Sequence, residues 1–319
     1  MMSNMSSKRP SSSKPESDSA SRVSGELKSP SGTAQPLAAG LYIVATPIGN
    51  LRDITLRALD VLAGVDLVLA EDTRVARRLL THHGIRAKLS PYHDHNGARR
   101  RPELIAALEA GQRLALISDA GTPLVSDPGW KLAHEVIEAG FEVIPIPGPS
   151  AALAGLVSSG LPSDRFMFCG FLSPKAGSRR KTLREVAEVP GTLIFYESAQ
   201  RLAASLQDMS DILGADRGVA VARELTKLFE ETRRGRLAEL AEQYQTEPAP
   251  KGEIVVLIGP PPPSETNQED LDSHLLEALK HHPVKQAANS VAETFNLPKR
   301  EVYQRALSLK DHASKPTTG

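Results

Sequence analysis

The sequence predicts an α/β fold, and two features carry this prediction. Short apolar runs with the length of buried strands alternate along the chain with segments that have the spacing of amphipathic helices. Several of these runs stop abruptly in loops rich in proline and glycine. In open α/β sheets, ligands bind at the carboxyl ends of the strands. We therefore expect a ligand site on these loops.

One segment near the middle of the chain has both features. The run Leu114–Ile117 predicts a buried strand, which breaks at the loop SDAGTP of residues 118–123. Gly121 and Pro123 cannot continue a strand and force a stiff turn that allows a close backbone approach. A second break at residues 127–129 precedes a helix. We expect the rest of the first domain to be organised around this segment.

The remaining elements of the first domain follow in order. Strands are predicted at 41–46, 65–70, near Lys88 and at 141–146, and helices at 54–63, after Arg74 up to His83, at 102–109, 130–139 and 151–159. Three of the strands end in Pro/Gly loops, at Pro47, Gly121 and Gly148, and we expect these loops to line a cleft at one edge of the sheet. The first loop lacks GxGxxG, so a dinucleotide fold is not predicted.

A junction at residues 161–164 is expected to open a second α/β unit. Its strands are predicted at 166–172, 192–196, 217–224, 227–233 and 253–258, and its helices at 179–187, 199–213 and 237–244. After a proline linker, helices are predicted near 270–280, 284–295 and 299–309. They resemble a small helix-turn-helix, which could read nucleic acid or act as a dimer or capping element. The predicted domains are 39–162 and 163–260, with a helical extension at 267–312.

Composition limits the function classes. With 319 residues and 40% apolar content, the chain is long enough for two domains with cores of their own. It carries 38 basic and 38 acidic residues, which argues against a uniformly basic surface but leaves local basic patches open. Aromatic residues make up only 4%, too few for a large platform that stacks single-stranded nucleic acid. Cys169 is the only cysteine, which excludes an internal disulfide and a cysteine-based zinc site.

The location of the protein is predicted from what the sequence lacks. No apolar run approaches the length of a membrane span, and the N-terminus has no signal-peptide core. We therefore expect a soluble, cytoplasmic protein.

Residues 1–38 are rich in Ser, Lys and Pro and have almost no apolar periodicity, so we expect a disordered tail that activity does not require. His93 and His95 suggest a metal, but a metal site needs three or four converging ligands, so we predict none and expect residues 92–96 to form a loop that faces substrate.

Eight motifs occur along the chain in a specific order. They are YIVATPIGNL at 42–51, AEDTR at 70–74, YHDHN at 92–96, SDAGTP at 118–123, PGPSA at 147–151, GLPSDRF at 160–166, IFYES at 194–198 and ARELTK at 222–227. Each motif is weak by itself, but together and in this order they resemble the ribosomal RNA small-subunit methyltransferase I family. The resemblance covers residues 41–259, and the terminal helices match the extension of that family.

The resemblance implies a tetrapyrrole-methylase-like fold of two domains, that of a class III methyltransferase, with S-adenosylmethionine in a cleft between the domains. It implies methylation of the ribose 2′-hydroxyl of a cytidine in the decoding region of 16S rRNA, on the small ribosomal subunit, by an enzyme that is usually a homodimer. The sequence departs from the family in two places. Ala199-Gln200 stand where Pro-His is common, which excludes a catalytic histidine there, and Cys169 replaces an acidic or small residue.

Stiff loops suit cofactor binding because they are ordered before the ligand arrives. The predicted cofactor-binding residues are Pro47, Gly49, Asp119, Ala120, Gly121, Thr122, Pro123, Gly148 and Ser150. We expect backbone groups of Gly121, Thr122 and Gly148 to contact the adenosine and methionine parts. The side chains of Asp119 and Ser150 would be polar anchors.

A ribose hydroxyl is a poor nucleophile at neutral pH, and a positioned base typically contributes about 10²–10⁴-fold in rate. The sequence offers Glu71, Asp72, His95 and Glu224 as catalytic bases and does not rank them. A structural ion pair of Glu224 with Arg223 is an equal alternative to catalysis.

RNA contacts are predicted for Arg74, Asn96, Arg99, Lys175, Arg179 and Arg180, although basic clusters are more often solvated surface.

Two other functions remain open. One is a tetrapyrrole C-methyltransferase on the same fold, acting on a precorrin or uroporphyrinogen. The basic clusters and the helical extension argue against it, because a small anionic macrocycle requires neither. The other is a non-enzymatic RNA-binding or regulatory protein built on the terminal helices, and the rigid cleft loops argue against that.

Overall fold

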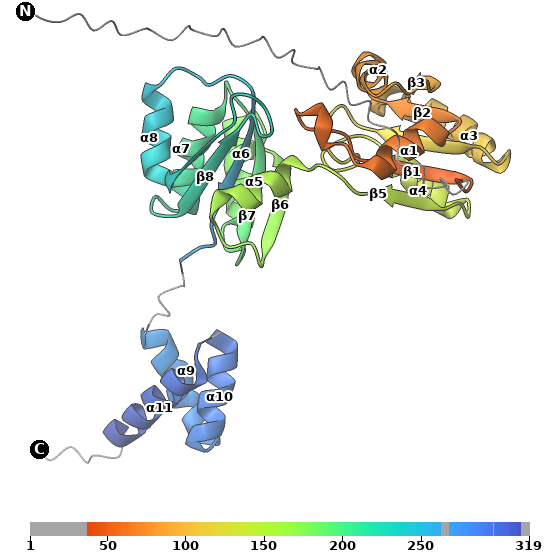
Figure 1. The fold of residues 1–319 in the computed structure, drawn as a ribbon. Helices are drawn as coiled ribbons and strands as arrows, with labels where there is room; N and C mark the ends of the chain where they lie inside the picture. The colour runs from red at the N-terminus through yellow and green to blue at the C-terminus, as the bar shows by residue number, and fades with distance from the viewer. Residues whose placement is uncertain (1–36, 263–267, 296, 314–319) are drawn as a thin grey trace, which may run out of the picture. The chain divides into compact units, whose positions relative to one another are not determined.

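The computed structural model describes residues 37–262, 268–295 and 297–313 (Figure 1). Except for residues 37 and 38, the predicted disordered tail lies outside the described residues. Leu37 packs against the core of the first sheet. Within the described ranges, no helix has the length and apolar character needed to cross a bilayer.

The first sheet contains five strands, all parallel, in the order β3-β2-β4-β1-β5. The strands are β1 (Gly40–Val44), β2 (Leu67–Ala70), β3 (Leu89–Pro91), β4 (Arg113–Ile117) and β5 (Val143–Ile146). Because β1 lies between β4 and β5, the loops that follow these three strands leave the same edge side by side. The expectation that the loops at Pro47, Gly121 and Gly148 share one edge is confirmed.

Both faces of this sheet are buried, which is why its strands read as continuous apolar runs rather than as alternating ones. Tyr42 and Val44 of β1 pack into the core on one face, and Leu41 and Ile43 pack into the core on the other. The first core includes residues of α1 and α2, and the second includes residues of α3 and α4. These helices are α1 (Leu56–Gly64), α2 (Thr73–His82), α3 (Asp94–Glu109) and α4 (Trp130–Glu138), and a short 3-10 turn, η1 (Leu51–Asp53), precedes α1.

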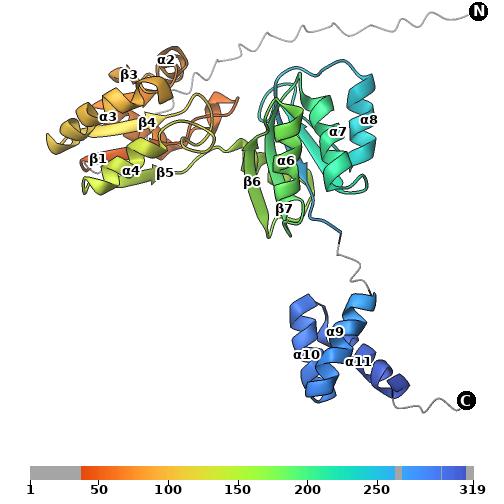
Figure 2. The same cartoon turned by 180° about the vertical axis from the view of Figure 1, so that it is seen from behind.

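The second sheet has the order β6-β7-β10-β8-β9, in which β6 pairs with β7 in parallel and the other pairs are antiparallel. Its strands are β6 (Phe166–Phe171), β7 (Thr192–Ser198), β8 (Gly218–Arg223), β9 (Glu231–Arg236) and β10 (Glu253–Ile258). One face is covered by α6 (Ala176–Val186), α7 (Leu202–Leu213) and α8 (Leu237–Thr246), as Figures 1 and 2 show.

The other face of the second sheet is covered by α5 (Ala151–Ser159). A side chain at Gly155 would bring its Cβ to 3.2 Å from Val255 Cγ1, so a glycine lets this helix lie close to β10. The chain thus passes from the first sheet to the second before α5, whereas the predicted boundary at residue 162 follows it. That division into domains stays a prediction, and the packing of α5 favours an earlier boundary.

The C-terminal helices are α9 (Gln268–His281), α10 (Val284–Phe295) and α11 (Lys299–Ala313). They share a core of their own, in which Leu275, Ala288 and Val302 are buried. An ion pair between Asp272 and Arg305, with N and O 2.5 Å apart, joins α9 to α11. The three predicted terminal helices are therefore present.

The first turn of α3 corrects one prediction. Residues 92–96 were expected to be a loop, with a helix beginning at Pro102, but the helix begins at Asp94. The Asn96 side chain accepts a hydrogen bond of 3.0 Å from the His93 N–H and so caps the true start. Pro102 therefore lies inside the helix. Proline is rare there and common in the first turn of a helix, which is why the sequence predicted a start at Pro102.

Gly129 should be a sensitive position in the first domain. It precedes α4 with φ +128°, and a Cβ there would lie 2.5 Å from Leu116 Cδ2 in the core. We expect Gly129→Ala to destabilise the domain by about 1–3 kcal/mol through strain and overpacking. The urea midpoint, followed by the fluorescence of the single tryptophan, Trp130, measures this.

Gly177→Ala in α6 is the matched control, because a Cβ at Gly177 meets no atom within 4 Å. It should leave stability unchanged or raise it by up to about 1 kcal/mol. Equal midpoints for the two variants would contradict the assignment of Gly129 to a tightly packed, strained turn.

Candidate functional site

The loops after β1 and β4 are tied together at the edge of the first sheet. The Thr46 N–H donates to the Gly121 carbonyl at 2.8 Å, and the Gly121 N–H donates back at 3.0 Å. The buried Thr46 hydroxyl also donates to the Ser118 carbonyl at 3.1 Å. These bonds hold both loops in one conformation without a ligand.

The loop after β5 joins this arrangement through a side chain. The Thr122 hydroxyl donates to the Pro149 carbonyl at 3.2 Å. At Gly148, a Cβ would lie 3.0 Å from the Cβ of Ala45, so the glycine lets this loop pack against the end of β1. Gly121 has φ +81°, a conformation that favours glycine. The three loops are therefore one connected surface.

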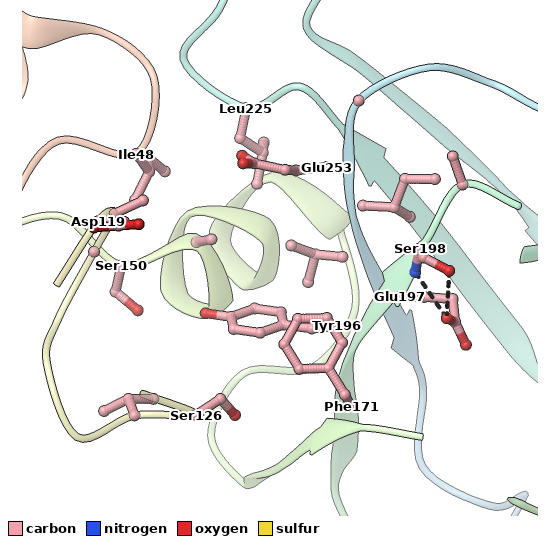
Figure 3. A pocket seen from close by; sticks show the side chains of 18 of the residues that line it. Ile48, Asp119, Ser126, Ser150, Phe171, Tyr196, Glu197, Ser198, Leu225 and Glu253 are labelled. Carbon is pink, nitrogen blue, oxygen red and sulfur yellow. Dashed lines mark hydrogen bonds between the residues drawn. The ribbon is translucent and has the colours of Figure 1, made fainter. Parts of the chain in front are cut away.

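A cavity of about 590 Å³ lies beside these loops and is walled on its other side by the second sheet (Figure 3). Its apolar wall includes Ile48, Phe171 and Leu225. Tyr196 of β7 packs against Phe171 with ring centroids 5.4 Å apart, and Figure 3 shows its hydroxyl directed toward the side where Asp119 and Ser150 lie. Four carboxylates line the cavity: Asp119, Asp127, Glu197 and Glu253.

Helix α5 begins at this cavity. Ser150 is its N-cap, and the Ser150 hydroxyl accepts a bond of 3.5 Å from the Leu153 N–H. Ser150 and Ala151 both line the cavity. A helix N-terminus presents backbone N–H groups and a partial positive charge, which suit an anionic group of a ligand.

Asp127 has an unusual environment in the cavity wall. Burial of its carboxyl, together with the negative charges of Glu71 and Asp119, raises its pKa to about 6. Burial also raises the pKa of Tyr196, and the charge of Asp127 adds to that effect. At neutral pH the Tyr196 hydroxyl therefore stays protonated and can donate.

Two loops of strained backbone border the cavity. Leu124 and Ser126, in the loop between β4 and α4, have φ +72° and +60°, and Glu224 and Thr226, in the loop after β8, have φ +51° and +66°. Within the described ranges, these four are the non-glycine residues with positive φ. Such conformations cost about 1–3 kcal/mol each and gather at functional sites. The strained residues therefore border the same cavity as the loops that are hydrogen-bonded to one another.

The end of β7 is held by a buried carboxylate. Glu197 is 3% exposed and accepts hydrogen bonds from the Ser205 hydroxyl at 2.5 Å, from Arg201 Nε at 3.0 Å and from the Ser198 N–H at 2.7 Å. These bonds fix the segment 198–200, which lines the cavity. Glu197 and Arg201 also form an ion pair, with N and O 2.9 Å apart.

The predicted cofactor residues divide into two groups. Those that line the cavity are Asp119, Ala120, Gly121, Thr122 and Ser150. Pro47 and Gly49 instead line a smaller hollow of about 160 Å³ that shares Asp119 with the cavity, and Gly49 packs against Lys227. Pro123 is buried, and Gly148 serves loop packing. Neither lines the cavity, so we leave both out of the proposed contacts.

Two of the predicted bases already have strong partners. The Arg74 guanidinium, 2.6 Å from Asp72, holds the pKa of that carboxyl at about 2. Lys227 lies 2.8 Å from Glu224 and lowers its pKa. The ion pair that the sequence suggested for Glu224 therefore forms with Lys227, while Arg223 pairs with Glu231 at 3.2 Å.

The other two predicted bases, His95 and Glu71, are exposed and outside the cavity lining. His95 lies in the first turn of α3, with its ring 5.9 Å from that of His93. In the part of the chain that the structure describes, no three His, Cys, Asp or Glu side chains gather as metal ligands would. Glu71 follows β2, and its charge acts on Asp127. Of these two, only Glu71 is linked to the cavity.

The predicted RNA-binding residues also differ in their surroundings. Arg179 is 5% exposed and pairs with Asp208 at 2.5 Å, so its guanidinium is committed to the fold, and Asn96 caps α3. Arg180 is partly exposed and lies 3.3 Å from Asp211. The most exposed of the six are Arg74, Arg99 and Lys175.

Sequence reasoning missed Asp127, Tyr196 and Phe171 as cavity residues. Asp127 had a visible signal, the break Asp127-Pro128-Gly129 before α4. Tyr196 lies within the motif IFYES, but nothing in that pattern indicates which way its side chain points. Cys169, which departs from the family pattern, is half-buried in the second domain, and burial raises the pKa of its thiol to about 11.

Comparison with known proteins gives consistent matches. A family model described as "Tetrapyrrole (Corrin/Porphyrin) Methylases" matches residues 40–241, and one described as "RsmI C-terminal HTH domain" matches 265–310. The "Ribosomal RNA small subunit methyltransferase I" of Mesorhizobium japonicum is 53% identical over 87% of this chain and 95% of its own length. The proteins of that name from Synechocystis and Escherichia coli O157:H7 are each 47% identical, over 85% and 84% of this chain and 98% and 94% of their own lengths.

Solved structures share the fold at lower identity. A cobalt precorrin-4 methyltransferase is 17% identical with a TM-score of 0.53, covering 69% of this chain and 94% of its own. The methyltransferase CobJ is 20% identical with a TM-score of 0.53, covering 70% and 94%. At these identities the likeness concerns the fold alone.

The buried pair of Arg179 and Asp208 can be tested through stability. Arg179→Gln leaves Asp208 buried without its closest partner, so we expect a loss of about 3 kcal/mol and a melting temperature lower by several degrees in calorimetry. Arg184→Gln, on the exposed side of the same helix, should stay within about 0.5 kcal/mol of wild type. Equal melting temperatures for both variants would mean that Arg179 does not stabilise the fold.

Proposed function

Because the chain belongs to the tetrapyrrole methylase family, with relatives that are ribosomal RNA small subunit methyltransferases I at 47% and 53% identity, we propose that it methylates the RNA of the small ribosomal subunit. It is a methyltransferase whose methyl donor is S-adenosylmethionine. The observation that carries the proposal is the cavity at the tied loops, because its size and chemistry fit this donor.

The fit of the donor rests on three properties of the cavity. Its volume of about 590 Å³ lies within the range of about 300–1,000 Å³ that is usual for small-molecule sites. Its apolar wall at Ile48, Phe171 and Leu225 suits an adenine ring. The N-terminus of α5 suits the carboxylate of the methionine part. When bound, the donor supplies an electrophilic methyl group on a positively charged sulfur.

The chain's own residues would hold the donor as follows. Backbone groups of Gly121 and Thr122 contact it from the loop after β4, and the Ser150 hydroxyl and the first turn of α5 bind its carboxylate. The carboxylates of Asp119 and Asp127 face its positive charges. Because the loops are already hydrogen-bonded to one another, little conformational entropy is lost when the donor binds.

The finer assignment follows from the family resemblance. We propose that the acceptor is the ribose 2′-hydroxyl of a cytidine in the decoding region of 16S rRNA, that the enzyme acts in the cytoplasm, and that it is a homodimer. The exposed side chains of Arg74, Arg99 and Lys175 would contact phosphates, and the three terminal helices give a second surface for RNA.

The alternative of a tetrapyrrole substrate is not favoured by any specific observation. The cobalt precorrin-4 methyltransferase and the methyltransferase CobJ share the fold at 17% and 20% identity, and a shared fold at this identity gives no information on whether a tetrapyrrole fits this cavity.

The proposed function is tested by supplying small ribosomal subunits from cells that lack this protein with the purified enzyme and isotope-labelled S-adenosylmethionine. We expect label in one nucleotide, which mass spectrometry of nuclease digests identifies as 2′-O-methylcytidine. Free uroporphyrinogen III is the control acceptor and should take up no label. Label on a base, label in the porphyrinoid, or unlabelled subunits would contradict the proposal.

A further inference from the structure

Asp127 differs from the other carboxylates that line the cavity in its lack of a bonding partner within the described residues. Asp119 accepts a bond of 3.1 Å from the Asp72 N–H, Glu253 pairs with Lys227 at 3.0 Å, and Glu197 is fully bonded at the end of β7. Among the described residues, no hydrogen bond or ion pair reaches the Asp127 carboxylate. A half-buried carboxylate without a partner lowers stability, so its presence in a cavity wall indicates a role with a ligand.

The loop that carries Asp127 is held in place on both sides. Leu124 and Ser126 have positive φ just before it, and Gly129 has φ +128° just after it. A Cβ at Gly170 of β6 would lie 3.0 Å from Ser126 Oγ, so the loop packs closely against the second sheet. Strained backbone persists only where its surroundings fix it. The backbone that carries the Asp127 side chain is therefore held by the fold.

Tyr196 gives the same part of the cavity a hydrogen-bond donor. Its ring packs against Phe168 and Phe171, with centroids 4.9 Å and 5.4 Å away. Its hydroxyl points toward the side where Asp119 and Ser150 lie (Figure 3). Burial, and to a lesser extent the negative charge of Asp127, raises the pKa of this hydroxyl above its ordinary value, so it is protonated at neutral pH and can donate. Asp127, a hydrogen-bond acceptor, and Tyr196, a hydrogen-bond donor, thus line the same cavity as the loops that would hold S-adenosylmethionine.

We propose that Asp127 is the base that accepts the proton of the hydroxyl being methylated, and that Tyr196 positions that hydroxyl by donating a hydrogen bond to its oxygen. The inference rests on the proposed function. The ribose oxygen forms a bond to the methyl carbon as the bond from that carbon to sulfur breaks, and the hydroxyl proton passes to the Asp127 carboxylate. The products are S-adenosylhomocysteine, 2′-O-methylribose and a protonated carboxyl, which then loses its proton to water.

The charges around Asp127 suit this role. Burial, with the negative charges of Glu71 from the loop after β2 and Asp119 from its own loop, raises its pKa to about 6. Tyr196, Lys251 and Glu253 line the cavity from the second sheet. At pH 7 a carboxyl with this pKa is mostly ionised, yet it is a stronger base than an ordinary carboxylate. Asp72 and Glu224, in contrast, are weakened as bases by Arg74 and Lys227.

Single-turnover methylation of small subunits by Asp127→Asn is the first test, with Asp60→Asn as the matched control on the exposed face of α1. We expect Asp127→Asn to lower the rate by about 10²–10⁴-fold, because the amide keeps the shape but cannot take the proton. Asp60→Asn should retain the wild-type rate. Affinity for S-adenosylmethionine, measured by calorimetry, should fall by no more than about tenfold in Asp127→Asn.

Proton release on donor binding is a second readout that does not depend on turnover. At pH 6 the Asp127 carboxyl holds roughly half a proton, and a cationic sulfonium nearby lowers its pKa and expels part of it. Calorimetry of S-adenosylmethionine binding in two buffers of different ionisation enthalpy measures this release. Wild type and Asp60→Asn should release protons, Asp127→Asn should not, and Glu71→Gln should release fewer because its Asp127 begins with a lower pKa.

The outcomes separate the inference from the proposed function. A wild-type rate in Asp127→Asn, equal proton release in all variants, or complete loss of donor binding in Asp127→Asn would overturn the role of Asp127 as the base. If Asp127→Asn does not fold, the comparison of wild type with Glu71→Gln decides by the same calorimetry. If wild type binds the donor and releases protons but does not methylate the RNA, the proposed acceptor is wrong while the ionisation of Asp127 stands.

Discussion

The pair of hydrogen bonds between Thr46 and Gly121 is the constraint on which the site depends. It joins the loops after two neighbouring parallel strands, and the Thr122 hydroxyl adds the loop after a third. Since parallel strands end at one edge, three stiff loops meet there without any long excursion of the chain. The result is a surface that is ordered before a ligand binds, which is what the alignment of a methyl donor with an oxygen requires.

The second sheet completes the cavity with a different chemistry. It contributes the aromatic pair Tyr196 and Phe171 and the strained loop around Leu225, and α5 links the two sheets by starting at the cavity and packing on the second sheet. The polar loops and the aromatic wall therefore come from different sheets. A donor that is both aromatic and charged fits a cavity built in this way.

Local patterns in the sequence predict much of the first sheet and of the loops at its edge. The apolar runs and the Pro/Gly breaks predict the parallel strands and the shared loop edge, because both depend on near neighbours in the chain. Asp127 and Tyr196 were missed because their environment is created by residues of distant segments, Glu71 and Phe171 among them. Arg179 was predicted to contact RNA because the partner that buries it, Asp208, lies on another helix and is not visible from the local sequence. The predicted start of α3 at Pro102 was wrong because Asn96 caps the helix further upstream.

The most direct test of the central claim is a crystal structure of the protein bound to S-adenosylhomocysteine. The account predicts that the ligand lies in the cavity, with backbone groups of Gly121 and Thr122 and the start of α5 in contact with it, and with its sulfur on the side of Asp127. Loops in the same conformation as in the free protein would support their preorganisation. A ligand bound elsewhere, or loops that rearrange to admit it, would contradict the account.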